Sequence, residues 1–151
     1  MPDMELTTHK IFQTLFGNRN GNCQAACLAT LLGVALDDVP HFCRDVPKGQ
    51  DWVMAQNKWL AAKHGLVMVS FRLKPNGGLP SINALADGIP CLISGKSPRG
   101  KFNHSVVGLY RLKDGMHQLD YVHDPHPDGT FLEKAKSVDF FITCRPGMGG
   151  R

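Results

Sequence analysis

The stretch that decides the fold is residues 21–33, G-N-C-Q-A-A-C-L-A-T-L-L-G. Small and apolar residues fill nearly every position of 25–32, a composition typical of a central helix that is covered on most sides. Asn22 is a suitable N-cap and Gly33 a suitable C′ residue, so the start and stop signals agree on a helix of about three turns. Cys23 would then stand at the beginning of that helix.

Cys23 has two interpretations. At a helix N-terminus, the unpaired backbone N–H groups and the positive end of the dipole favour a thiolate, the nucleophilic form of cysteine. The alternative is a small buried hydrophobe, which free cysteines often are. Cys27, one helical turn deeper in the apolar run, illustrates that alternative, because burial makes a thiol inert. The choice depends on partners for Cys23 elsewhere in the chain.

Length and cysteine usage predict a single domain, 1–151, with a flexible C-terminal tail at about 146–151. The cysteines are odd in number and fall mostly in apolar segments, so we expect free thiols in a reducing compartment. The sequence contains no signal-peptide pattern and no apolar run of membrane-spanning length. These observations predict a cytoplasmic protein that neither needs a cofactor nor contacts a membrane.

The charge pattern gives no sign of nucleic-acid binding. The formal net charge is +4, and Lys and Arg are scattered along the chain instead of being grouped in a basic patch. We therefore expect no nucleic-acid partner.

The first half of the chain reads as helical. Residues 9–16 form either a short helix or a packed extended arm, and a brief helix follows Asp37 or Asp38. Residues 50–64 have helical periodicity, with Asp51 as a cap and Gly65 as the stop.

The second half reads as a sheet. Strands are expected at about residues 66–73, 89–94, 104–111, 116–123 and 139–144, with a short helix over 81–88. The turn 113–115, Lys-Asp-Gly, makes a hairpin of the third and fourth strands. Helices followed by a mostly antiparallel sheet place the chain in the α+β class.

That hairpin can supply the partners that Cys23 needs. A cysteine nucleophile requires a base, and a third group that orients the base. His104 begins one strand and Asp124 follows the end of its antiparallel partner, so the pairing brings imidazole and carboxylate together. Singly, His104 could be a surface residue and Asp124 a turn former before proline.

Together these segments resemble a known family. The motifs N-C-Q-A-A-C-L-A-T-L-L, P-C-L-I-S-G, N-H-S-V-V-G-L-Y and Y-V-H-D-P are similar to those of papain-like cysteine peptidases of the bacteriocin-leader peptidase type. The resemblance spans roughly residues 13–125 and implies a papain-like fold and a thiol hydrolase. It implies that Cys23 is the nucleophile, His104 the general base and Asp124 the orienting residue. It also implies that Gln13 lines the oxyanion hole, the site that stabilises negative charge on the substrate oxygen.

The chain departs from that family next to the nucleophile. Gln24 replaces the usual Gly, and Gln13 lies farther upstream than the family spacing, so Gln24 or Asn22 is an alternative oxyanion donor. The residues expected to line the cleft are Gln24, Asn22, Asn103, His123 and His126. The expected substrate is a peptide or protein.

Two other functions stay open from the sequence. A zinc site could combine Cys23 and Cys27 with His123 and His126, although our preferred interpretation has no metal. A papain-like domain could also be a deamidase or acyltransferase acting on a protein partner, or a catalytically dead binding module.

The segment 95–103, G-K-S-P-R-G-K-F-N, leads directly to His104. Its composition predicts a mobile, solvated loop. Lys96, Arg99 and Lys101 would give the cleft entrance a positive field, which would favour an acidic substrate or partner.

Overall fold

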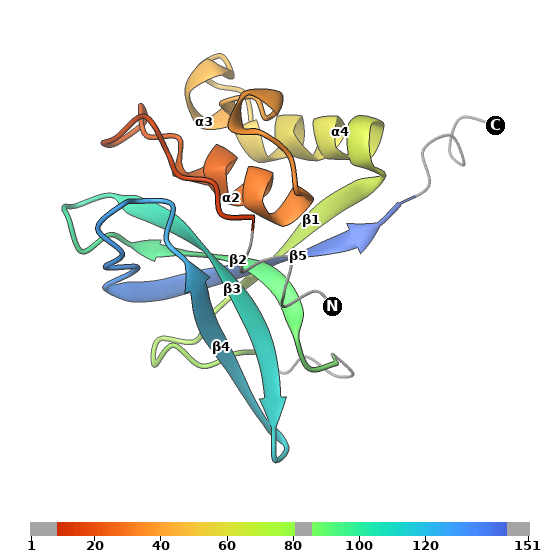
Figure 1. Cartoon of the computed structure of the whole chain (residues 1–151), viewed down its shortest axis with the longest axis vertical. Coiled ribbons are helices and arrows are strands. Elements are labelled where there is room, and N and C mark those ends of the chain that lie inside the picture. The colour runs from red at the N-terminus through yellow and green to blue at the C-terminus, as the bar shows by residue number, and fades with distance from the viewer. Residues whose placement is uncertain (1–8, 81–85, 145–151) are drawn as a thin grey trace.

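The computed structural model describes residues 9–80 and 86–144 and shows helices gathered on one side of an antiparallel sheet (Figure 1). The helices come first in the chain: α2 (Cys23–Leu32), the 3₁₀ turn η1 (Leu36–Asp38), α3 (Phe42–Asp45) and α4 (Trp52–His64). The strands follow: β1 (Leu66–Arg72), β2 (Ile89–Lys96), β3 (Asn103–Lys113), β4 (Met116–His123) and β5 (Lys134–Thr143). The predicted α+β class is confirmed.

The sheet has the strand order β1-β5-β2-β3-β4, and every neighbouring pair is antiparallel. The last strand thus lies between β1 and β2, although it comes latest in the chain. It begins at Lys134, five residues before the predicted 139. The sequence pattern missed this part because residues 134–137 are mostly polar, and they join the sheet by backbone pairing with the end of β2.

The predicted central helix is α2, and it packs on β3 and β2. Ala26, Cys27 and Leu28 have no exposed surface, and Gly33 ends the helix in the left-handed conformation. The expected cap is wrong, because the side chain of Asn22 makes no capping hydrogen bond. Its Oδ1 instead accepts from the backbone N–H groups of Thr14 and Leu15.

Because Cys27 is buried in this core, burial raises its pKa well above the ordinary thiol value. Cys27→Ala should therefore leave the chemistry of the site intact while lowering the free energy of unfolding by about 1 kcal/mol or more through lost packing. Urea denaturation monitored by circular dichroism measures this loss. If the variant had the same free energy of unfolding as the parent, the side chains around residue 27 would have to fill the space left by the sulfur without loss of stability.

Residues 9–16 form the packed extended arm rather than the short helix. The backbone N–H of Ile11 donates to Thr30 of α2 (3.1 Å), and its carbonyl accepts from His123 Nε2 at the end of β4 (2.6 Å). The N–H of Gln13 donates to the carbonyl of Pro125 (2.9 Å). The arm therefore ties the central helix to the loop that follows β4.

The other predicted elements are present with shifted bounds. Asp51 caps α4 by accepting from Val53 and Met54, and Gly65 ends it in the left-handed conformation. The brief second helix is divided into η1 and α3. Part of the helix expected at 81–88, residues 81–85, lies outside the described residues, as does the predicted tail. In the described part of the chain, no helix has the length and apolar character needed to cross a membrane.

The predicted hairpin of β3 and β4 is confirmed. Lys113 pairs with Met116, and the two residues between them, Asp114 and Gly115, both have positive φ (52° and 75°). This is the conformation that an Asp-Gly turn favours. The tip of the hairpin projects away from the helices (Figure 1).

Candidate active site

Cys23 is the first residue of α2 and is half-buried at the side of a cleft of about 530 Å³. The loop 17–21 forms one wall of this cleft. Gly21 allows the chain to double back there, since a Cβ atom at this position would lie 2.6 Å from the carbonyl oxygen of Gly17. The predicted placement of Cys23 at a helix start is confirmed.

His104 lies at the start of β3 and is buried. Its Nε2 is 2.7 Å from Asp124 Oδ1, and the ring is close enough to Cys23 for the cysteine side chain to act on the pKa of the imidazole. Burial acts to lower the pKa of His104, but the hydrogen bonds with Asp124 and Cys23 outweigh it and raise the pKa to about 9. The structure thus brings Cys23, His104 and Asp124 together, with His104 hydrogen-bonded to Asp124 and interacting with Cys23.

Asp124 directly follows β4 and is held by both of its oxygens. Oδ1 accepts from His104 and from the N–H of His126 (3.0 Å), while Oδ2 accepts from the N–H of Phe131 (2.8 Å) and from Arg99 Nη2 (2.7 Å). Burial would raise the pKa of this carboxyl, but the hydrogen bonds from His104, His126 and Phe131 lower it. Asp124 is therefore an ionised, fixed acceptor for the imidazole.

A local irregularity of the hairpin shapes this junction. The register between β3 and β4 shifts between Val107 and Gly108. A Cβ atom at Gly108 would lie 2.7 Å from the carbonyl oxygen of Asp120 and 2.4 Å from Ile93 Cδ1, so the close approach requires glycine.

Arg99 is a site residue that the sequence interpretation placed wrongly. Its guanidinium bonds Asp124 through Nη2 and Asp128 through both Nε (2.8 Å) and Nη2 (2.5 Å), and its side chain is only 16% exposed. No spacing pattern pairs residue 99 with residue 124. The sequence offers one chemical indication. A buried carboxylate needs a compensating positive charge, and the cationic Arg99 precedes His104 by five residues.

The segment 95–103 is therefore not the positively charged, freely solvated loop that its composition predicted. Lys96 belongs to β2 and forms an ion pair with Glu133 (2.5 Å), and Arg99 is paired with two carboxylates. The N–H of Ser97 donates to the carbonyl of Phe102 (2.9 Å), which closes the loop on itself. Two of the three predicted cations are thus neutralised by partners.

Gln13, the candidate oxyanion residue, is buried beside Cys23. It lines a smaller cavity of about 180 Å³ together with Cys23, Asn103 and His126. Its Nε2 donates to the carbonyl of Leu15 (2.8 Å), and its Oε1 has no hydrogen-bond partner among the described residues. One of the two amide hydrogens is thus used to fix the side chain.

The amides of Asn22 and Gln24 are committed elsewhere. Asn22 is buried under the arm, where Nδ2 donates to Thr14 Oγ1 (3.1 Å). Gln24 does line the cleft, but its Nε2 donates to Gln56 (3.2 Å) and its Oε1 accepts from Ser105 (2.9 Å). Asn22 is therefore not the cleft-lining residue that we expected, and the Gln24 amide is held by partners at both its nitrogen and its oxygen.

Of the other expected cleft residues, Asn103 and His126 line a cavity with Cys23 and His123 does not. Asn103 lines both cavities that contain Cys23, and His126 lines the smaller one. The ring of His126 packs edge-on against Phe16. His123 does not line the rim as expected: it is buried, bonded to the arm, and its pKa is lowered mainly by burial.

The imagined zinc ligands are likewise dispersed. Cys27 lies in the core and His123 donates to a backbone carbonyl. Across residues 9–80 and 86–144 no three Cys, His, Asp or Glu side chains form a group that could hold a metal.

The remaining cysteines differ from Cys23 in their surroundings. Cys43 also lines the large cleft, but burial raises its pKa to about 11, and burial raises that of Cys91 to about 12. Within residues 9–80 and 86–144, neither has a histidine partner of the kind that His104 provides for Cys23. Reactivity is therefore expected at Cys23.

No protein-family model matches this chain, and neither do curated proteins or solved structures. The function is therefore inferred from the residues and their geometry.

Proposed function

We propose that this protein is a cysteine-dependent hydrolase that cleaves an amide or peptide bond through a thioester on Cys23. The observation that carries the proposal is the convergence of Cys23, His104 and Asp124 at the edge of an open cleft, with His104 hydrogen-bonded to Asp124. A nucleophile, a base and a group that orients the base are the components that acyl transfer requires.

The reaction follows from this order. His104 takes the thiol proton, and the Cys23 thiolate adds to the substrate carbonyl carbon to form a tetrahedral intermediate. The imidazolium then gives its proton to the leaving amine as the C–N bond breaks, which leaves a thioester. His104 next removes a proton from water, the hydroxide attacks the thioester, and the carboxylic acid departs as Cys23 recovers its proton.

The negative charge on the intermediate oxygen needs donors. The first-turn backbone N–H groups of α2 have no partners within the helix and carry the positive end of its dipole. Gln13 is the best placed side-chain candidate. It lines a cavity with Cys23 and uses one amide hydrogen for Leu15, whereas Asn22 lines neither cavity that contains Cys23 and Gln24 is bonded at both its amide nitrogen and its oxygen. We therefore assign Gln13 the oxyanion role.

The proposal includes a papain-like fold. Its support is the nucleophile at the start of a helix packed on an antiparallel sheet, with the base and its orienting carboxylate on the sheet, in the chain order Cys, His, Asp. Deamidation and transfer to an amine share the thioester and would differ only in substrate or acceptor. A binding module without turnover is the competing function.

Reactivity mapping separates enzyme from binding module. The protein is treated with iodoacetamide at neutral pH, and the adducts are mapped by mass. Cys23 should react at least about tenfold faster than Cys43, which shares the cleft but lacks the histidine. Equal, slow labelling of both thiols would refute the proposed chemistry.

Turnover should fall as pH rises above about 9. The pKa of His104 is raised to about 9, so the imidazolium that protonates the leaving amine persists up to that pH and is lost beyond it. A profile of kcat/KM between pH 5 and 11 measures the pH at which the rate falls on the alkaline side. A fall near the ordinary histidine value, about 6.5, would contradict the assignment of His104 as the acid.

Arg99→Gln should lower kcat by about 10- to 100-fold with little change in KM, because Arg99 fixes Asp124 and, through it, the imidazole. Arg99→Lys should restore part of the rate, since it keeps the charge but not the two-carboxylate geometry. Steady-state kinetics of both variants test this positioning role. An unchanged kcat in Arg99→Gln would show that the backbone donors alone hold Asp124.

A further inference from the structure

The face of the sheet that the helices cover changes character near Cys23. Toward the core it carries apolar side chains, among them Met68, Leu92 and Val107, which pack with α2. Farther along the strands, beyond the N-terminal end of α2, the same face of the sheet carries polar side chains. Those that line the cleft are Ser70, Ser94, Ser105, Ser137 and Asp139.

This polar strip is continuous across four strands. Ser94 of β2 pairs with Ser105 of β3 and with Ser137 of β5, and Ser70 of β1 pairs with Asp139 of β5. Directly paired residues point to the same face of an antiparallel sheet. The strip is therefore the floor of the cleft, and α2 places Cys23 at its side.

Asp139 is the charged member of that floor. Among the described residues that line the cleft it is the one carboxylate, and Arg19 on the exposed loop 17–21 is the one cation. The hydroxyl of Ser70 donates to Asp139 Oδ1. Burial raises the pKa of Asp139, and this cost of partial desolvation is what an opposite charge in the cleft would offset.

The cleft lining also contains apolar side chains that suit an aliphatic chain. Trp52 and Val53 from the start of α4 line the cleft, together with Met68 on β1. A long side chain with a cationic end could lay its methylene groups along these residues while its head reaches the carboxylate. A lysine or arginine side chain, or an alkylamine, has this combination of stem and charge.

We propose that Asp139 and the serine floor form a substrate subsite beside Cys23 that selects a cationic group, of the lysine or arginine type. The subsite rests on the proposed function, because it specifies which amide or peptide is presented to Cys23. It also reverses the charge preference that the composition of residues 95–103 predicted, since Lys96 and Arg99 are neutralised by their partners.

The test uses charged thiol reagents and does not need the natural substrate. The intact protein is treated with the trimethylammonioethyl or the sulfonatoethyl methanethiosulfonate. The Cys23 thiolate attacks the thiosulfonate sulfur, a mixed disulfide forms and methanesulfinate leaves. Rates are read for Cys23 by mass mapping, which separates it from Cys43 in the same cleft.

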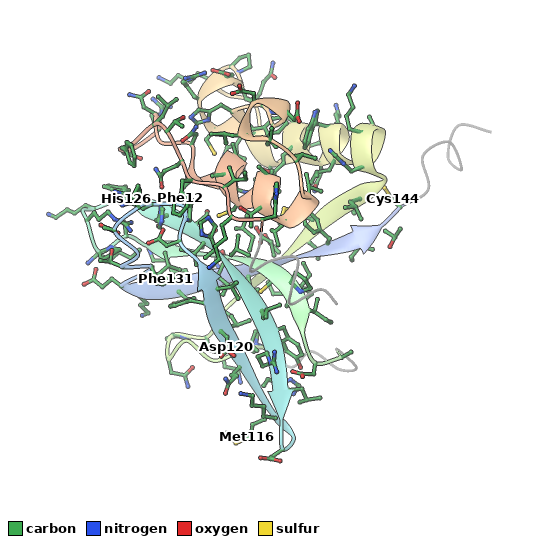
Figure 2. The ribbon with its side chains drawn as sticks, in the orientation of Figure 1. Phe12, Met116, Asp120, His126, Phe131 and Cys144 are labelled. Carbon is green, nitrogen blue, oxygen red and sulfur yellow. The ribbon has the colours of Figure 1, made fainter. Side chains whose placement is uncertain are left out.

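The cationic reagent should be favoured, and Asp139→Asn should reduce the cation-to-anion rate ratio by about tenfold, the order expected for one unit charge at close range in a partly screened site. Asparagine keeps an acceptor for Ser70, so the floor is preserved. Asp114→Asn is the matched control: it removes the same charge at the hairpin tip, next to Met116 in Figure 2 and far from the helices, and should leave the ratio unchanged.

The outcomes separate the two proposals. A Cys23 that reacts no faster than Cys43 would refute the hydrolase, while the rate ratio would still report the subsite. A fast Cys23 with equal ratios in the parent and Asp139→Asn would overturn the subsite and leave the hydrolase standing. An anion preference in the parent would also overturn it, because Arg19 would then dominate the cleft.

A second measurement uses turnover. Three peptides that differ only in lysine, norleucine or glutamate beside the scissile bond are compared by kcat/KM. The parent should prefer lysine over norleucine by about tenfold in kcat/KM, and Asp139→Asn should remove that preference. A preference that survives the substitution would overturn the subsite.

Discussion

Replacing Cys23 by alanine should abolish turnover, with a loss of at least about 10⁴-fold, and replacing His104 by alanine should cost nearly as much. In the proposed mechanism Cys23 forms the bond to the substrate and His104 moves the proton in each step, so neither can act alone. The double variant should therefore be no slower than either single variant. Initial rates with a peptide amide, extended to long incubations, measure these losses.

The control for this prediction is that the Cys23→Ala variant stays folded. Cys23 lies half-buried at a helix start, so alanine there removes little packing, and the melting temperature should stay within a few degrees of the parent. Cys27→Ala, one turn away in the same helix, should show the opposite pattern of a lower melting temperature and retained turnover. If Cys23→Ala stays active, the nucleophile has been assigned to the wrong residue.

Asp124→Ala should have the largest effect on stability. The substitution leaves His104, Arg99 and the N–H of Phe131 without their shared acceptor in a buried place. Removing one partner of such a network costs about 3–5 kcal/mol, or roughly 10 °C in melting temperature for a chain of this size. Turnover should fall as well, because nothing then holds the imidazole of His104 in the orientation in which it faces the thiol.

Asp124→Asn tests the charge separately from the shape. The pKa of Asp124 is lowered in the folded state, so its contribution to stability is fully present above the unfolded value of about 3.9 and is lost as pH falls through the lower folded value. The stability gap between the parent and Asp124→Asn should therefore narrow below about pH 4. A gap that is constant from pH 7 to pH 3 would show that charge plays no part.

Sequence patterns were sufficient to predict the elements that depend on residues close together in the chain. The helix at 23–32 has a small-residue interior and a glycine stop, and the hairpin at 113–116 has the Asp-Gly pair that its backbone requires. The neighbourhood of His104 and Asp124 then follows from strand pairing alone. These features depend on residues close in sequence, which is why the pattern predicts them.

Long-range contacts account for what the sequence did not reveal. Arg99 looked like a solvated loop cation until the fold placed two carboxylates against it. His123 looked like a cleft residue, but the arm that precedes α2 covers it and takes its N–H. Gln24 looked like a donor for the substrate oxygen, and the sheet instead supplies Ser105 and α4 supplies Gln56 as its partners.

The central place of β5 has a consequence for biosynthesis. β1 pairs with β5 and β2 also pairs with β5, so the two earlier strands have no direct contact in the sheet order. While the chain is being made, the segment up to β4 can form its hairpins, but β1 has no partner strand until residues 134–143 have been made. The sheet therefore closes only when β5 is inserted, and the cleft floor, which takes residues from β1, β2, β3 and β5, is completed in that same step.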